Sequence, residues 1–209
     1  MSGRSESSAG TDRLIAVRIA AVSGVVLAGS AAQLVGYGFF HGRVPALDSA
    51  SDGGLFGLVG DVSIATATVA AWIVLIRVRP VSVIMVALPP ALTFLTLDKV
   101  FRLHDHIPHW LVFYLPVLAA TFVAVAAVAR GLSPRSLRLT AIGLALLIGS
   151  FALHQYGEWL LYHLGGSDAG WMFQVKAVVK HGSEVAGWFL IALGLAVGLR
   201  EHDSLHVSI

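Results

Sequence analysis

Six long apolar runs constrain this chain more than any other feature of its sequence. Each is long enough to hold the roughly 20 apolar residues that an α-helix needs to cross a bilayer. They lie near residues 14–40, 55–76, 81–103, 110–129, 137–164 and 172–199. The sequence therefore predicts an all-α, polytopic bundle of six transmembrane helices in the plasma (inner) membrane.

The composition agrees with a membrane protein and excludes several functions. Of the 209 residues, 56% are hydrophobic and only 12% are charged, against about 25% charged residues in an ordinary soluble domain. The basic residues lie between the apolar runs, so the net charge of +2 is explained by orientation in the lipid bilayer, and we expect no nucleic-acid partner. Because the chain has no cysteine, it forms no disulfide, thiolate metal site or iron–sulfur cluster.

Both ends of the chain differ from the apolar domain at residues 14–199. Residues 1–13 are polar and small, which predicts a disordered cytoplasmic tail, and residues 200–209 form a second cytoplasmic tail. The first apolar run continues well past Ser30-Ala31-Ala32, so an uncleaved helix is favoured over a signal peptide.

The arginines predict the orientation of the six helices. The loops at 41–53, 104–109 and 165–171 contain a single arginine, Arg43. The segments on the other side of the membrane contain nine arginines. These are Arg4, Arg13, Arg18, Arg77, Arg79, Arg130, Arg135, Arg138 and Arg200. Because positive residues stay inside, both termini are predicted to be cytoplasmic, which requires an even number of helices.

With this orientation, the acids, histidines and lysines within the apolar runs fall in the outer half of the bundle. Charges in such positions are costly, and they usually pair with one another or face a water-filled cavity. We predict that they line one polar pocket open to the outside. The candidate residues are Asp61, Asp98, Arg102, Asp105, His154, Glu158, Lys180, His181 and Glu184.

Helical spacing indicates ion pairs within this set. Asp98 with Arg102, and Lys180 with Glu184, are opposite charges at i and i+4. This favours a structural function, in which the pocket is the ion-paired core of a non-enzymatic membrane subunit or accessory protein. Such a protein is expected to associate with a larger envelope transporter or complex.

The alternative is a metal-binding protein with redox or hydrolytic chemistry. His154 and Glu158 are four residues apart on one helix, and His181 and Glu184 are three apart on another. These four residues are the candidate metal ligands, and nitrogen and oxygen donors of this kind suit a divalent zinc, iron or manganese ion. Lys180 argues against this alternative, because an ammonium repels the metal unless it neutralises an acid.

Other chemistries find less support. A haem held by His154 and His181 would lie among too many charges. A proton path would need polar residues in the inner half of the bundle, which offers almost none. The loop with His104, His106 and His109 is more typical of a solvated turn than of a metal site. Gly194 and Gly198 form a small-xxx-small pair of the kind that lets two membrane helices approach closely.

Two segments carry a resemblance to a group of proteins. These are Asp98-Lys-Val-Phe-Arg-Leu-His104-Asp105, and Lys180-His-Gly-Ser-Glu184 with the Val-Ala-Gly-Trp188 that follows. Together they resemble uncharacterised multi-pass bacterial membrane proteins of an actinobacterial type, over about residues 54 to 195. That group typically has a second Asp where this chain has Lys99, and an acidic pair where it has Lys180 and His181. The resemblance implies a fold and a membrane location, and the two departures favour ion pairing over a carboxylate metal site.

Overall fold

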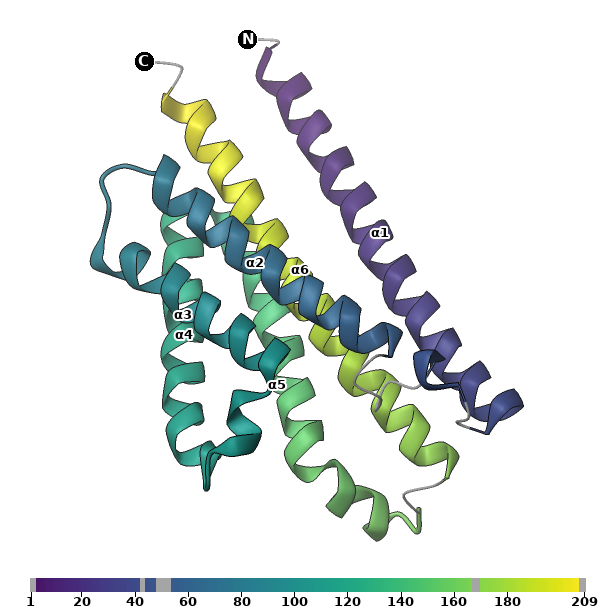
Figure 1. Ribbon diagram of the computed structural model, residues 1–209. Helices are drawn as coiled ribbons and strands as arrows, with labels where there is room; N and C mark the ends of the chain where they lie inside the picture. Colours follow the sequence, from purple (N-terminus) through teal and green to yellow (C-terminus); the bar gives the residue numbers. More distant parts are fainter. Residues whose placement is uncertain (1–2, 42–43, 48–53, 167–169, 207–209) are drawn as a thin grey trace.

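The computed structural model describes residues 3–41, 44–47, 54–166 and 170–206, and within these it is an all-helical bundle (Figure 1). The helices are α1 (Gly3–Phe40), α2 (Leu55–Arg77), α3 (Val83–Phe101), α4 (Trp110–Leu132), α5 (Pro134–His163) and α6 (Trp171–His206). Two short 3-10 turns, η1 (Pro45–Leu47) and η2 (Leu103–His106), follow α1 and α3. All six helices contain a segment long and apolar enough to cross a membrane. The predicted six-helix fold is confirmed.

The helix ends follow local chemistry. α3 begins at Val83 because the side chain of Ser82 accepts a hydrogen bond from the Met85 backbone N–H, which caps the helix. It ends at Phe101 because Arg102 adopts a left-handed conformation with φ of 51°. Its two ends therefore fall inside the predicted limits of 81 and 103.

The terminal helices are longer than their apolar segments. α1 begins at Gly3, so residues 3–13 of the predicted disordered tail are helical in this structure. α6 continues to His206, through most of the predicted C-terminal tail. The membrane-crossing part of α1 begins at Ile15. Arg43, the basic residue of the first predicted outer loop, lies outside the described residues.

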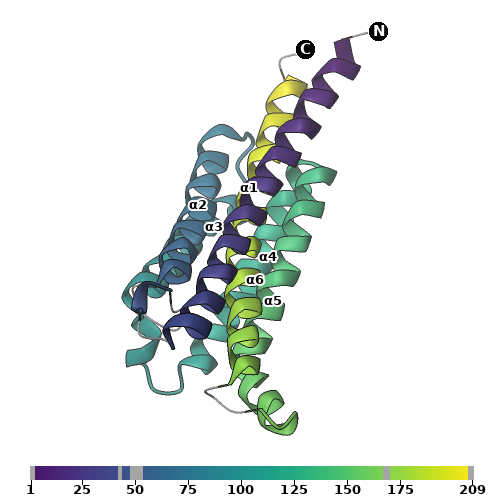
Figure 2. The ribbon, with the colours of Figure 1, turned by 90° about the vertical axis from the view of Figure 1, so that its right-hand side faces the viewer.

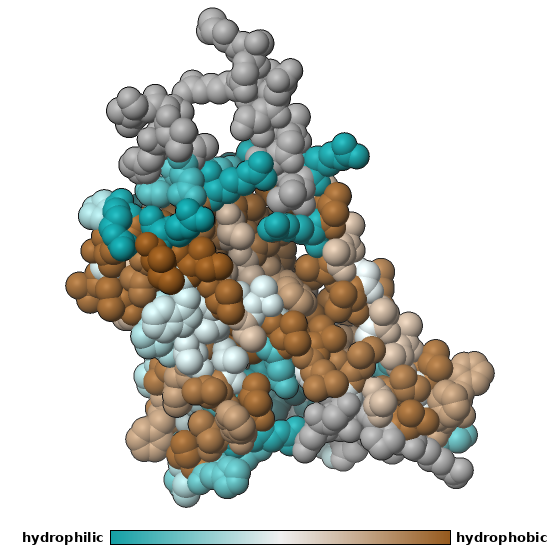
Figure 3. Space-filling model, turned by 45° about the horizontal axis from the view of Figure 1, so that its top comes forward, coloured by the Kyte–Doolittle hydropathy of each residue, from teal (hydrophilic) through white to brown (hydrophobic). Residues whose placement is uncertain are grey.

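α6 organises the bundle, because it packs against α1, α2, α4 and α5. α1 lies at one edge and contacts chiefly α6, as the two ribbon views show (Figures 1 and 2). The same views place both chain ends at one end of the bundle. Hydrophilic side chains gather at this end and at the opposite one, with a mainly hydrophobic band between them (Figure 3).

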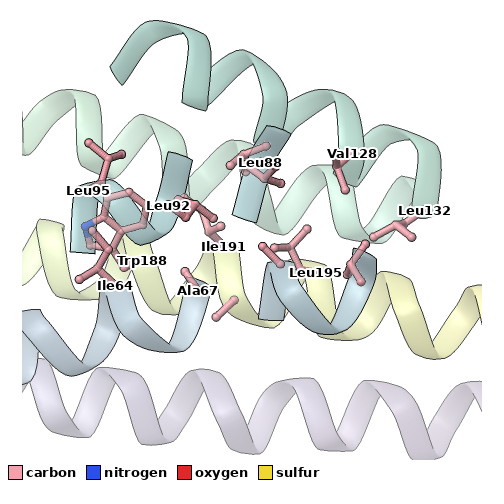
Figure 4. Close-up of a cluster of buried hydrophobic side chains, with 14 of the residues drawn as sticks. Ile64, Ala67, Leu88, Leu92, Leu95, Val128, Leu132, Trp188, Ile191 and Leu195 are labelled. Carbon is pink, nitrogen blue, oxygen red and sulfur yellow. The ribbon is translucent and has the colours of Figure 1, made fainter. Parts of the chain in front are cut away.

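The apolar core lies between α2, α3, α4 and α6. Leu88, Leu92, Ile191 and Leu195 are almost completely buried there (Figure 4). Burial of a leucine or isoleucine side chain contributes about 1.5–3 kcal/mol. The core ends at Ile64, Leu95, Leu147 and Trp188, which also line a cavity. The apolar core therefore extends toward the end of the bundle that carries the chain termini, and toward the opposite end it borders this cavity.

Candidate functional site

A polar pocket of about 600 Å³ lies at the end of the bundle opposite to the termini. It is lined by residues within 57–64 of α2, 95–101 of α3, 110–122 of α4, 147–154 of α5 and 180–188 of α6, together with Arg102 and η2. Eight of the nine predicted residues line it: Asp61, Asp98, Arg102, Asp105, His154, Lys180, His181 and Glu184. Glu158 does not line the pocket and is exposed. The structure thus brings together side chains that five separate helical elements and a turn supply.

An ion pair between two helices crosses the pocket. Lys99 Nζ on α3 lies 2.6 Å from Glu184 Oε1 on α6, and both side chains are only about a fifth to a quarter exposed, at 24% and 21%. His181 Nδ1 lies 3.8 Å from the other carboxylate oxygen. Gly60 of α2 provides the space for the lysine, because a Cβ at that position would lie 3.2 Å from Lys99 Cε.

The predicted pairing of Lys180 with Glu184 is therefore corrected. The cation that binds Glu184 comes from the facing helix α3 and not from the preceding turn of α6. Within the described residues, the Lys180 ammonium has no hydrogen bond or ion pair. An ion pair between residues i and i+4 of one helix contributes only a few tenths of a kcal/mol. The Lys99–Glu184 pair also joins α3 to α6, and it forms in place of the Lys180–Glu184 pair.

Asp98 is the most buried acid of the pocket, at 3% exposed. Its Oδ1 accepts a hydrogen bond of 2.8 Å from the His104 backbone N–H. Its Oδ2 lies 2.8 Å from His104 Nδ1 and accepts a short hydrogen bond from the Tyr114 hydroxyl. An ionised carboxylate only accepts hydrogen bonds, so Nδ1 of His104 carries a proton. These contacts tie the end of α3 to η2 and to the first turns of α4.

The predicted pairing of Asp98 with Arg102 is also corrected. Asp98 is bound by His104 and Tyr114, and Arg102 instead lies at the left-handed C-cap of α3, where its N–H donates to the Asp98 carbonyl. The i, i+4 geometry holds only along a continuous helix, and α3 ends at Phe101. Arg102 still faces the pocket and is close enough to Asp61 to interact with it electrostatically.

We expect the Asp98→Asn variant to lose about 1–3 kcal/mol of unfolding free energy. Asp98 contacts the His104 backbone N–H, the His104 ring and the Tyr114 hydroxyl, and a carboxamide has only one oxygen to accept hydrogen bonds from them. Thermal unfolding in detergent, followed by the tryptophan fluorescence, measures the change. The matched control is Asp105→Asn, since that carboxylate is 54% exposed and its loss should stay within about 0.5 kcal/mol. Equal effects of the two substitutions would contradict the structural role of Asp98.

Three residues of the site escaped prediction as pocket residues. In the sequence, Lys99 differs from the proteins that the chain resembles but gives no sign of facing the pocket, and the loop with His104 is typical of a solvated turn. Tyr114 occurs in an apolar run without any polar neighbour in sequence. The His104, Trp110 and Tyr114 rings form an aromatic wall, with centroids 5.0 to 5.8 Å apart.

The structure does not support the metal alternative. Across residues 3–41, 44–47, 54–166 and 170–206, no three or more His, Asp or Glu side chains are arranged to hold one metal ion. Of the four candidate ligands, Glu158 lies outside the pocket lining and Glu184 is bound by Lys99. His154 and His181 line the pocket, but His181 approaches Glu184 without completing a ligand set.

The chain matches no protein-family model, and no curated protein or solved structure is significantly similar to it.

Proposed function

We propose that this protein is a non-enzymatic integral membrane subunit or accessory protein with an ion-paired pocket open to the extracytoplasmic side. The observation that carries the proposal is the Lys99–Glu184 ion pair, which joins α3 to α6 inside the pocket. Charged groups in membrane helices are retained where they pair or line a polar cavity, and here they do both.

The state of the acids favours a structural or binding role over catalysis. Glu184 is held by Lys99 and Asp98 is held by His104 and Tyr114. A carboxylate that is bound in this way has fewer lone pairs free for a metal ion, and its contacts connect neighbouring parts of the fold. The two most central acids of the pocket therefore stabilise its walls.

The orientation rests on the charge distribution. Apart from Arg43 and Arg102, the arginines lie in the first half of α1, at or just after the end of α2, around the junction of α4 and α5, and near the end of α6. These places are at the end of the bundle that carries the termini, and the pocket lies at the other end. The positive-inside rule puts the arginine-rich end in the cytoplasm. The pocket then opens to the outside. α1, the least buried of the six helices, offers its apolar surface to lipid or to a larger envelope complex.

A single cysteine at the pocket tests the proposal. The chain has no cysteine of its own, so the His154→Cys variant carries one thiol. A charged, membrane-impermeant thiosulfonate reagent is expected to modify it rapidly in right-side-out membrane vesicles and not in sealed inverted vesicles, because the pocket holds water and opens outward.

The control is Ile148→Cys on the same helix, because that side chain is 57% exposed and does not line the pocket. Its thiol faces lipid and should remain unmodified in both preparations. Modification of the His154→Cys variant from the cytoplasmic side alone, or no modification from either side, would contradict an outward-opening pocket.

A further inference from the structure

Two charged side chains in the pocket have no direct partner among the residues that the structure describes. In the described part of the chain, the Asp61 carboxylate of α2 and the Lys180 ammonium of α6 form no hydrogen bond and no ion pair. Both residues line the pocket and are half-buried. They differ in this respect from Asp98, Lys99 and Glu184, which bind one another or a neighbouring side chain.

The two unpaired charges lie at different places in the pocket. Asp61 is near the Lys99–Glu184 pair and interacts with both groups through space. Lys180 precedes Glu184 by four residues, which is about 6 Å along α6 toward its first turn. Lys180 is not among the charged groups that act on Asp61, and Asp61 is not among those that act on Lys180, so neither neutralises the other.

Such an arrangement is costly without a ligand. A charge that leaves bulk water loses solvation, and the loss is offset only when an opposite charge or a hydrogen-bond partner replaces the water. Among the described residues, neither group is bound directly by an opposite charge: Lys99 and Arg102 act on Asp61, and Glu184 acts on Lys180, only through space. A ligand that carries both a cationic and an anionic group can bind the Asp61 carboxylate with the first and the Lys180 ammonium with the second.

We infer that the pocket binds a small zwitterion, with its cationic group at Asp61 and its anionic group at Lys180. This inference rests on the proposed outward-open pocket and names its ligand class. His154, which lines the pocket without a hydrogen-bond partner among the described residues, provides an additional donor for the anionic group. The volume of about 600 Å³ falls in the usual range for small-molecule sites.

The aromatic side chains fit the same ligand. Trp110, Tyr114, Phe122 and Trp188 line the pocket, and aromatic faces attract organic cations. Zwitterions of this type occur as free amino-acid-like solutes and as lipid headgroups such as phosphoethanolamine. The chemistry is shared, so the experiment must separate the two sources.

The test uses the full chain in nanodiscs of phosphatidylglycerol, titrated with phosphoethanolamine and with 4-aminobutyrate. Tryptophan fluorescence reports binding, and the thermal midpoint reports stabilisation. We expect at least one zwitterion to saturate the site and to raise the midpoint by about 5 °C or more at 100 times its Kd. Ethanolamine, butyrate and inorganic phosphate each supply one charge and should bind at least tenfold more weakly.

The Asp61→Asn and Lys180→Gln variants are each expected to weaken zwitterion binding by at least tenfold. Because each substitution removes an unpaired charge, neither should lower the midpoint of the ligand-free protein. A merely structural role for these residues predicts the opposite result, a lower midpoint. The ligand-free midpoint also shows that the variants fold.

A second set of nanodiscs, made of phosphatidylethanolamine, separates the sources. If the headgroup is the ligand, the wild-type midpoint rises in these nanodiscs, the two variants lose the rise, and the soluble zwitterions no longer bind. If the ligand is a solute, its affinity is the same in both lipids. The inference is overturned if neither lipid nor solute stabilises the protein, if single charges bind as well as zwitterions, or if the variants bind like the wild type.

Failure of this inference is distinct from failure of the proposed function. A His154→Cys variant that is modified from outside, together with no zwitterion binding, overturns the ligand class and leaves the outward-open pocket in place. Zwitterion binding together with modification from the cytoplasmic side alone overturns the orientation and leaves the ligand class in place.

Discussion

Replacing Gly143 with alanine is expected to lower the unfolding free energy by about 1–3 kcal/mol. Gly143 lies at a close approach of α5 to α6, and a Cβ there would be 2.6 Å from the backbone carbonyl oxygen of Gly187 and 3.0 Å from Ile191 Cγ1. A backbone atom cannot move aside as a flexible side chain does, so the two helices must separate. The contact is reciprocal, because a Cβ on Gly187 would meet the Gly143 carbonyl at 2.8 Å.

Gly149→Ala on the same helix is the matched control. No atom lies within 4 Å of the position that its Cβ would occupy, and alanine is a better helix former than glycine by up to about 1 kcal/mol. The control should be neutral or slightly stabilising. Unfolding in mixed detergent–denaturant titrations measures both variants. If Gly143→Ala were as well tolerated as Gly149→Ala, the close packing of α5 on α6 would be wrong.

The second large effect is expected at the pocket ion pair. Glu184→Gln leaves the Lys99 ammonium without its carboxylate, and Lys99→Met leaves Glu184 without its cation. Breaking a fully buried pair costs about 3–5 kcal/mol. Since both side chains are partly reached by water, we expect about 1–3 kcal/mol for each single substitution.

Glu158→Gln is the control for these variants, because Glu158 is a glutamate on the neighbouring helix α5 that is exposed and lies outside the pocket lining. Its effect should stay within about 0.5 kcal/mol. Thermal unfolding in one detergent compares the three proteins. A larger effect at Glu158 than at Glu184 would show that the acid on α5, and not the acid on α6, faces the polar interior.

The helices and the depth of the pocket were predictable because simple lengths control them. The bilayer thickness determines how long an apolar run must be, and each residue adds a fixed rise along a helix. Asp61 near the start of α2 and Asp98 near the end of α3 therefore had to lie at one level. The structure confirms the six helices and brings both residues into one pocket.

The contacts between the helices and the extent of the pocket were not predictable, and most of the errors follow from them. Glu158 lies one turn beyond His154 along the same face of α5, about 6 Å nearer the helix end, and falls outside the pocket lining. Lys99 and Glu184 lie 85 positions apart in sequence, so only the fold, which brings both side chains into one pocket, shows that they meet. His104 joins the site because α3 ends at a left-handed residue and turns back.

The measurement that tests the ion-paired pocket most directly is a double-mutant cycle on Lys99→Met and Glu184→Gln. We predict a coupling free energy of at least about 1 kcal/mol, because contacting groups are non-additive. The same cycle on Lys180→Met and Glu184→Gln should give a coupling several-fold smaller. A coupling near zero for Lys99 with Glu184, or a larger one for Lys180 with Glu184, would contradict the ion pair between α3 and α6.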